Sequence, residues 1–237
     1  MYKKELINLN ETKISLKTDL TSYNLRDYVQ LLRNDINNYI KNNSQFLSSL
    51  KPININSNLP IIDLMCEASK IADVGPIATV AGSIAEMSCE YLINLGSNYS
   101  IVDNGGDIAL INDEKVVCGI YSGNEYLNTS IGFKLKSRKK PIGICTSSGK
   151  VGLSISFGSS ESVTAISKKA SYADGLATSI ANAVNGTTSE DAINNAILKA
   201  EKYKDYFEGV LIIKEDKVAT IGKLPEMIST NDFDIDY

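Results

Sequence analysis

The sequence predicts an α+β fold in which a mostly antiparallel sheet packs against helices. Apolar residues recur at helical spacing through most of the first 95 residues, whereas apolar and polar residues alternate from Tyr99 to Lys168. Helical spacing then returns, followed by two short alternating segments. No repeat, low-complexity linker or break in composition divides the chain. We therefore expect one domain over residues 1–228, and an acidic, disordered tail over 229–237.

The first part of the chain predicts one strand and four helices. Residues 12–17 alternate between apolar and polar side chains, which is typical of a strand. Val29, Leu32 and Ile36 follow helical spacing. Gly75 ends one helix, and Pro76 suits the first turn of the next. The helices are expected at about 25–41, 43–50, 60–72 and 76–95, with a loop at 51–59.

The second part predicts the sheet, two further helices and a hairpin. Asn185-Gly186 ends the first of these helices, and Thr188 with Asp191 resembles a capping box that begins the second. Strands are expected near 99–103, 107–112, 115–121, 130–137, 142–146, 153–157 and 162–167, a helix at 172–184, another after Thr188, and a hairpin of 210–213 with 217–221.

Composition excludes several classes of function. The net charge of −4 argues against a nucleic-acid-binding protein. The chain has no histidine, which excludes Ser-His and Cys-His nucleophile pairs and His-ligated zinc. Its four cysteines are scattered without a CxxC pair, so we expect reduced core residues. No segment is long and apolar enough to cross a bilayer and the N-terminus has no signal-peptide core, so we expect a cytoplasmic protein without membrane partners.

A basic run, Lys134-Leu-Lys-Ser-Arg-Lys-Lys140, precedes Pro141. Its alternation predicts the solvent-facing side of a strand that leads into a turn, which we favour over a phosphate site.

The pair Asp174 and Thr178 is the strongest candidate site. A spacing of four places both side chains on one helix face, one turn apart. A carboxylate and a hydroxyl are hard oxygen ligands, which suit Mg²⁺ with a phosphate. The alternative is that Asp174 is a helix cap and Thr178 a surface residue. Small residues flank the pair and also occur after Pro76, so the two helices should pack closely, within one chain or between two copies in a homodimer.

Three loops are further candidates. Asp103-Asn-Gly-Gly-Asp107 is either a tight hairpin turn or a site where a ligand approaches the backbone. Gly75-Pro-Ile-Ala78 opens a helix whose free N–H groups attract anions, unless it is only a Pro-started helix. Cys145-Thr-Ser-Ser-Gly149 is either a hydroxyl-rich phosphate or ribose site or an ordinary turn, and Cys145 is expected to be an inert core cysteine.

The order of these pieces resembles the ApbE superfamily, whose best-known members are FAD:protein FMN transferases. The similarity is greater to a small ApbE-like branch of archaea and bacteria, through Val74-Gly-Pro-Ile-Ala-Thr-Val-Ala-Gly82, Cys145–Gly149 and Ser154–Gly158. It covers nearly the whole chain and implies an ApbE-like fold.

The resemblance implies a Mg²⁺ site and a flavin pocket. The metal ligands would be Asp174, Thr178 and the backbone carbonyl of Ala78. FAD or FMN would be the cofactor, and a Ser or Thr of an acceptor protein would receive FMN. The implied flavin or nucleotide contacts, together with those expected from the hydroxyl-rich turn, are Asn104, Gly105, Gly106, Asp107, Thr146, Ser147, Ser148 and Gly149.

Three features differ from the transferases. Thr79-Val80 stands where they carry Lys-Gly, their His-x-x-x-Pro segment has no counterpart, and their N-terminal Met-Gly-Thr strand is missing. Two hypotheses follow. One is a protein that binds a flavin or other pyrophosphate nucleotide with Mg²⁺, with FMN transfer as its most specific form. The other is a non-catalytic accessory or scaffold protein in anaerobic sulfur or redox metabolism.

Overall fold

The computed structural model describes residues 2–120, 131–148 and 162–229. Within these ranges the chain forms two antiparallel sheets and a layer of helices. The larger sheet has the strand order β1-β2-β3-β4-β7-β8-β9-β10 and the smaller has the order β11-β6-β5. The strands are β1 Lys3–Leu9, β2 Thr12–Thr18, β3 Ser100–Asn104, β4 Asp107–Asn112, β5 Val116–Gly119, β6 Ile131–Leu135, β7 Arg138–Ser147, β8 Ser162–Ser167, β9 Gly209–Lys214, β10 Lys217–Gly222 and β11 Glu226–Ser229.

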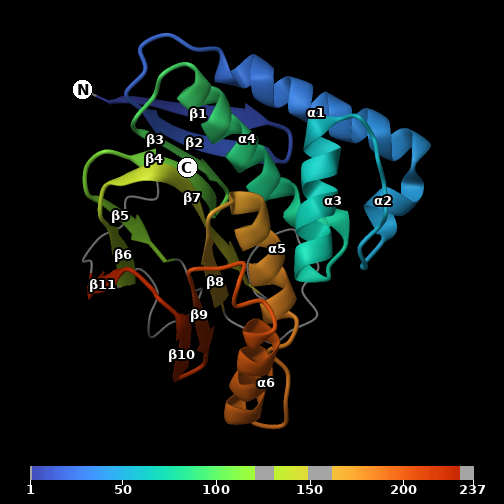
Figure 1. Ribbon diagram of the computed structural model, residues 1–237, viewed down its shortest axis with the longest axis vertical. Coiled ribbons are helices and arrows are strands. Elements are labelled where there is room, and N and C mark those ends of the chain that lie inside the picture. The colour runs from blue at the N-terminus through green and yellow to red at the C-terminus, as the bar shows by residue number, and fades with distance from the viewer. Residues whose placement is uncertain (1, 121–130, 149–161, 230–237) are drawn as a thin grey trace.

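The helices cover one face of the large sheet and the small sheet covers the other (Figure 1). The helices are α1 Leu25–Asn42, α2 Ser44–Ser48, α3 Pro60–Ala72, the 3₁₀ turn η1 Pro76–Thr79, α4 Val80–Asn94, α5 Ala170–Ala181 and α6 Ser189–Glu201. Side chains alternate between the two faces along each strand. On β4, Ala109 and Ile111 join the helix-side core, whereas Leu110 joins the core beneath the small sheet.

The predicted α+β class and its mostly antiparallel sheet are confirmed, and most helix boundaries agree within a few residues. Thr188 caps α6 as expected, since its hydroxyl accepts a hydrogen bond from the Asp191 N–H at 3.1 Å. The strand β1 was not predicted. Ser229, placed in the tail by the sequence, ends β11. The strand predicted at 153–157 and residues 230–237 lie outside the described residues.

The strand boundaries around the basic run were wrong. A break was expected before Pro141, because proline cannot donate a hydrogen bond to a neighbouring strand. The structure instead turns at Lys136-Ser137, and β7 continues through Pro141. A register shift between Leu110 and Asn112 of β4 occurs opposite this part of β7. Such a bulge accommodates the missing N–H without ending the strand.

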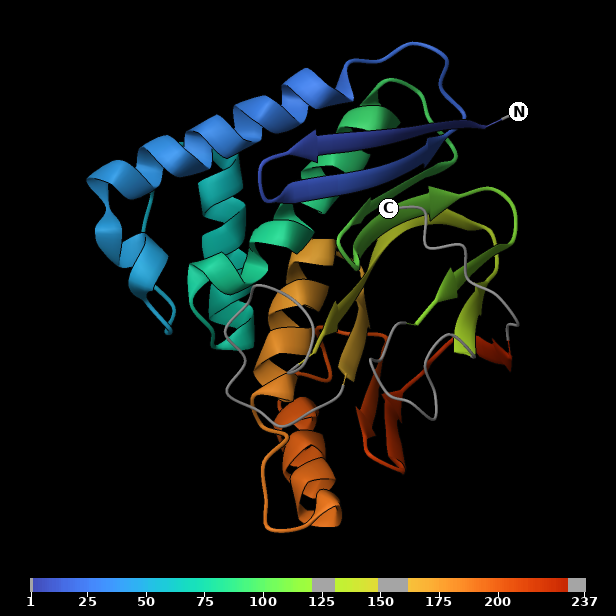
Figure 2. The ribbon, with the colours of Figure 1, turned by 180° about the vertical axis from the view of Figure 1, so that it is seen from behind.

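Helices α4 and α5 pack closely within the chain, which confirms the sequence prediction (Figure 2). Gly82 is the point of closest approach: a Cβ added there would lie 2.5 Å from the Ala170 carbonyl oxygen and 2.6 Å from the Asp174 Cβ. Gly143 of β7 has the same role on the sheet side, because a Cβ there would lie 2.2 Å from the Ala170 Cα. These two glycines let the start of α5 lie between α4 and the sheet.

Candidate functional site

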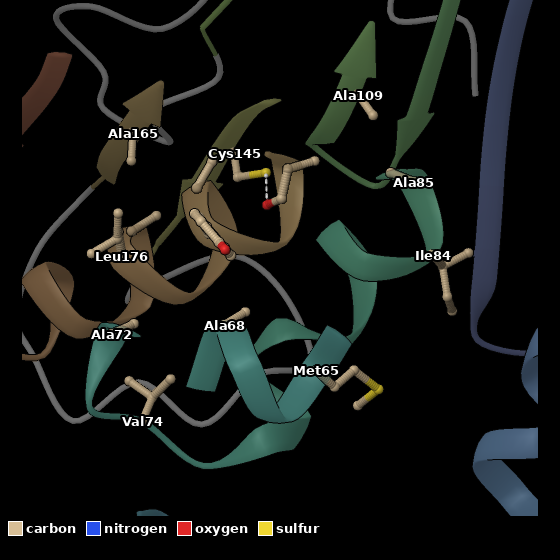
Figure 3. Packing of buried hydrophobic residues seen from close by; sticks show 14 of the residues in the cluster. Met65, Ala68, Ala72, Val74, Ile84, Ala85, Ala109, Cys145, Ala165 and Leu176 are labelled. Carbon is tan, nitrogen blue, oxygen red and sulfur yellow. Dashed lines mark hydrogen bonds between the residues drawn. The ribbon is translucent and has the colours of Figure 1, made fainter. Parts of the chain in front are cut away.

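Helix α5 carries Asp174 and Thr178 into the interior. All residues of this helix are buried, and its neighbours include α3, α4, β7 and β8. Ala68 and Ala72 of α3 belong to the same buried core as Leu176 of α5 (Figure 3). Asp174 and Thr178 are each 8% exposed. Thr178 is therefore not a surface residue, which contradicts the part of the structural alternative that concerns Thr178.

Asp174 binds the beginning of α4. Its Oδ2 atom accepts a hydrogen bond of 2.8 Å from the Gly82 N–H. This N–H lies in the first turn of α4, where helix N–H groups have no partner within the helix. In a continuous α-helix it would donate to the Ala78 carbonyl four residues earlier. Asp174 is thus a capping carboxylate for a neighbouring helix, and this N–H is directed to it instead of to Ala78.

Asp107 lies on the sheet next to this point. It begins β4 and pairs with Asn104 across the turn and with Cys145 on β7. The Asn104 amide donates to the Ala81 carbonyl at 3.1 Å, which ties this end of the sheet to the first turn of α4. Asp107 and Asp174 are close enough that the charge of Asp174 raises the pKa of Asp107. The fold therefore brings together two carboxyl groups that are far apart in sequence.

The two carboxyl groups have unusual protonation. Burial raises the pKa of Asp174 to about 7, although the Gly82 hydrogen bond acts in the opposite direction. Burial and then the neighbouring charge of Asp174 raise the pKa of Asp107 well above its usual value. Within the described ranges, neither carboxylate forms an ion pair with a lysine or arginine. The pair therefore places two carboxyl groups together in a poorly solvated part of the fold, with no lysine or arginine partner among the described residues.

Cys145 is a buried thiol at the same place. Its Sγ donates to the Ala170 carbonyl at 3.3 Å (Figure 3). Burial, followed by the charge of Asp107, raises its pKa well above the usual value. The four cysteines are all buried and form no disulfide, so the prediction of reduced core cysteines is confirmed. For Cys145 this means a hydrogen-bonding role beside Asp107 and no thiolate nucleophile.

Thr178 and Ala78 complete the implied ligand set. The Thr178 hydroxyl makes no hydrogen bond to any residue in the described ranges, although the side chain is largely buried. The segment around Ala78 lies against α5, since a Cβ on Gly175 would be 3.1 Å from the Thr79 Cγ2. Asp174, Thr178 and the chain from Ala78 to Gly82 therefore occupy one side of α5.

The turn at Gly105-Gly106 has a sufficient structural explanation. Both glycines have positive φ, 70° and 100°, as a two-residue hairpin loop requires. The Gly106 N–H donates to Asp103 Oδ1 at 2.8 Å. Nothing lies within 4 Å of a Cβ added to either glycine, so close packing does not demand them. The requirements of the hairpin turn therefore explain both glycines. Asn104 and Asp107 are the residues of this motif that lie on the α4–α5 side of the sheet.

The hydroxyl-rich segment divides between the two faces of the sheet. Thr146 pairs with Thr164, and their hydroxyls are 2.9 Å apart on the face away from Cys145. Ser147 alternates back to the helix side, and Ser148 is buried at the end of the segment. Gly149 lies outside the described residues. Of these side chains, that of Ser147 faces the same side as Asp107.

The carboxyl pair predicts a specific dependence of stability on pH. In the unfolded chain Asp174 ionises near pH 4, whereas in the folded chain its pKa is about 7. Between these values the unfolded state binds fewer protons, so stability falls as pH rises. In EDTA, the unfolding free energy of Asp174→Asn relative to wild type should increase by at least about 1 kcal/mol between pH 4.5 and pH 7.5. Urea titrations would measure it, and a difference that does not change with pH would contradict these shifted pKa values.

Comparisons with known proteins identify the family. The family model described as AbpE bacteria matches residues 7–205. A UPF0280 protein of Methanobrevibacter smithii is 54% identical over 231 residues, covering 97% of each chain. A UPF0280 protein of Methanocaldococcus jannaschii is 41% identical over 236 residues, covering 98% of this chain and 95% of that one.

Solved structures show the same fold at low sequence identity. The flavin transferase ApbE from Vibrio cholerae, H257G mutant, matches 93% of this chain and 97% of its own with a TM-score of 0.59 and 14% identity. The apo flavinyl transferase ApbE of Pseudomonas stutzeri matches 93% of this chain and 94% of its own, with a TM-score of 0.59 and 9% identity. Taken together, the family model, the archaeal relatives and the shared fold show that this chain belongs to the AbpE bacteria family, within the ApbE-like superfamily.

Proposed function

We propose that this protein binds a flavin or another pyrophosphate nucleotide together with Mg²⁺. The observation that carries the proposal is the pair of neighbouring carboxyl groups formed by the buried Asp174 and the partly buried Asp107. This pair has no lysine or arginine ion-pair partner within the described part of the chain. Two carboxyl groups that repel one another in a poorly solvated site are stabilised by a cation. Supporting it, the solved structures of the same fold are named flavin transferases.

The residues present fit Mg²⁺. Asp174, Thr178 and the Ala78 carbonyl would supply only oxygen atoms, which is the chemistry that Mg²⁺ prefers. No group of three or more His, Cys, Asp or Glu residues in the described ranges is arranged to hold a metal. Mg²⁺ does not need such a cage, because it usually keeps waters and takes one or two carboxylates together with substrate phosphates. A softer transition metal finds fewer matching ligands here.

The chain's own residues would orient the nucleotide. The η1 turn Pro76–Thr79 leads into α4, and the positive end of α4 would favour the negative charge of a pyrophosphate. Asn104 and Asp107 at the hairpin would line the same pocket from the sheet side. When bound, Mg²⁺ would neutralise charge on the phosphates. Asp174 would then link the metal to the Gly82 N–H that fixes its carboxylate.

The most specific form of the proposal is FMN transfer to an acceptor protein. A Ser or Thr hydroxyl oxygen of the acceptor would form a bond to the FMN phosphorus of FAD, the pyrophosphate bond would break, and AMP would leave. The hydroxyl proton must go to a base, which in a chain without histidine has to be a carboxylate, another side chain or solvent.

Isothermal titration calorimetry of the wild-type protein with FAD tests the binding proposal. We expect FAD to bind with Mg²⁺ present and to bind much more weakly with EDTA. FMN and ADP, each with Mg²⁺, would show which part of the ligand is recognised. If none of the three nucleotides binds, the hypothesis of a non-catalytic accessory protein is favoured instead. The absence of histidine from the sequence is consistent with that hypothesis.

Substitution of Thr178 should have a graded effect. Thr178→Val removes the hydroxyl and keeps the shape, so the affinity for FAD with Mg²⁺ should fall about tenfold because one neutral oxygen ligand is lost. Thr178→Ser retains the hydroxyl and is the matched control. Equal affinities of Thr178→Val and wild type would exclude the Thr178 hydroxyl from the site.

A further inference from the structure

A second region of the surface has a distinct chemistry. A groove of about 1060 Å³ lies where the β6–β7 turn meets the segment between β10 and β11. The described residues that line it include seven basic and two acidic side chains, and Leu135, Leu224 and Pro225 add apolar surface. The basic residues are Lys115, Lys134, Lys136, Arg138, Lys139, Lys140 and Lys223. We call this region the basic groove.

Two of these cations are already paired. Arg138 donates from both terminal nitrogens to Glu208, at 3.1 and 2.5 Å. Lys134 lies 3.1 Å from a carboxylate oxygen of Glu226. The remaining five lysines are exposed and form no ion pair with any residue that the structure describes: Lys115, Lys136, Lys139, Lys140 and Lys223. Five lysines without an ion-pair partner among the described residues thus surround one groove of a chain whose net charge is −4.

The basic groove is separate from the nucleotide site. Arg138 begins β7, whereas Cys145, seven residues along the same strand, pairs with Asp107. At about 3.3 Å per residue the two places are ~23 Å apart along the strand. The sequence interpretation of Lys134–Lys140 as one solvent-facing side of a strand therefore missed a groove. That groove forms only because the β6–β7 turn and the β10–β11 connection, far apart in sequence, lie side by side.

We propose that the basic groove docks an extended acidic segment of a partner protein, in which carboxylates alternate with apolar side chains. The lysines would meet the carboxylates, and Leu135, Leu224 and Pro225 would meet the apolar side chains. The volume is at or above the upper end of the range for pockets that enclose one small ligand. A chain segment therefore fits it better than a single phosphate does.

The observations favour an acidic protein segment over a nucleic acid. Outside the groove the chain is more acidic than its net charge indicates, so a long polyanion would be repelled wherever it leaves the groove. Among the described residues that line the groove, none has an aromatic side chain on which bases would stack. A short acidic segment confines its charge to the groove and needs no stacking surface.

Binding of a synthetic peptide in which Asp alternates with Leu tests the proposal. Fluorescence anisotropy should show binding to the wild-type chain that weakens about tenfold between roughly 50 and 500 mM NaCl. Replacing Lys136, Lys139 and Lys223 together by Ser should weaken it about tenfold as well. The control replaces Lys13, Lys202 and Lys204, which are exposed outside the groove, by Ser and should leave binding unchanged.

Other probes decide between the proposal and its rivals. A peptide with Asn in place of Asp tests the need for negative charge without any substitution in the protein. This neutral peptide should not bind to the wild-type chain. Equal binding of both peptides, or no binding of the acidic one, overturns the proposal. Tighter binding of a thymidine oligonucleotide or of inorganic triphosphate, lost in the same triple variant, would also overturn it by assigning the groove to a different anion.

Discussion

Asp174→Asn should reduce the affinity for FAD in the presence of Mg²⁺ by at least about 100-fold, because a charged metal ligand is replaced by a neutral one. The amide keeps the shape of the side chain, and its oxygen can still accept the hydrogen bond from Gly82. The loss should therefore come from the missing charge and not from local unfolding. Titration calorimetry with the folded variant measures it.

Two comparisons make this result specific. Asp205→Asn removes one negative charge at an exposed position with no ion pair in the described structure, and should leave FAD affinity unchanged. In EDTA, wild type and Asp174→Asn should bind equally weakly. If Asp174→Asn retained wild-type affinity with Mg²⁺, Asp174 would have only its capping role toward α4.

Gly82→Ala should destabilise the fold by about 2 kcal/mol or more. In an exposed helix this change would be stabilising by up to about 1 kcal/mol, because alanine has the higher helix propensity. Here the added Cβ would lie 2.5 Å from a backbone oxygen of α5, which cannot rotate away. Overpacking of this kind costs about 1–3 kcal/mol, and separating the helices would also weaken the Gly82–Asp174 hydrogen bond.

Chemical denaturation measures the change. Asn94→Ala, at the exposed end of the same helix, is the control and should alter stability by less than about 0.5 kcal/mol. A Gly82→Ala variant as stable as wild type would show that α4 and α5 can move apart without cost. Because Gly82 holds Asp174, the destabilised variant should also bind FAD with Mg²⁺ more weakly.

The sequence predicts the helices and most strands because their signals are local. Val29, Leu32 and Ile36 repeat at helical spacing. Asn104-Gly105 is a strong signal for a hairpin turn, and Gly105 and Gly106 have the positive φ that such a turn needs. Strand β1 lacks such a signal: among its residues only Ile7 is buried, since it is an edge strand with one covered face. The path of β7 through Pro141 depends on a bulge, which is a property of two paired strands.

The site is less accessible to sequence reasoning. Spacing of four indicates that Asp174 and Thr178 share a helix face, but it does not show that this helix is buried against Gly82 and Gly143. Asp107, whose pKa the charge of Asp174 raises, lies on a strand that is far from α5 in the sequence. Local sequence patterns therefore do not reveal that the two carboxyl groups are neighbours. Thr146 illustrates the opposite case, since alternation along β7 turns its hydroxyl away from Cys145 toward Thr164. Which hydroxyls face the site depends on strand register, and local composition does not reveal it.

A crystal structure of the protein with MnCl₂ and FAD tests the central claim most directly, because Mn²⁺ substitutes for Mg²⁺ and is located by its anomalous scattering. We predict one strong peak within about 2.0–2.3 Å of oxygen atoms of Asp174 and Thr178, adjacent to the pyrophosphate. Asp107 should lie on the sheet side of that peak. Bound FAD with no peak at Asp174, or a peak at a different place in the fold, would contradict the metal-assisted binding proposed here.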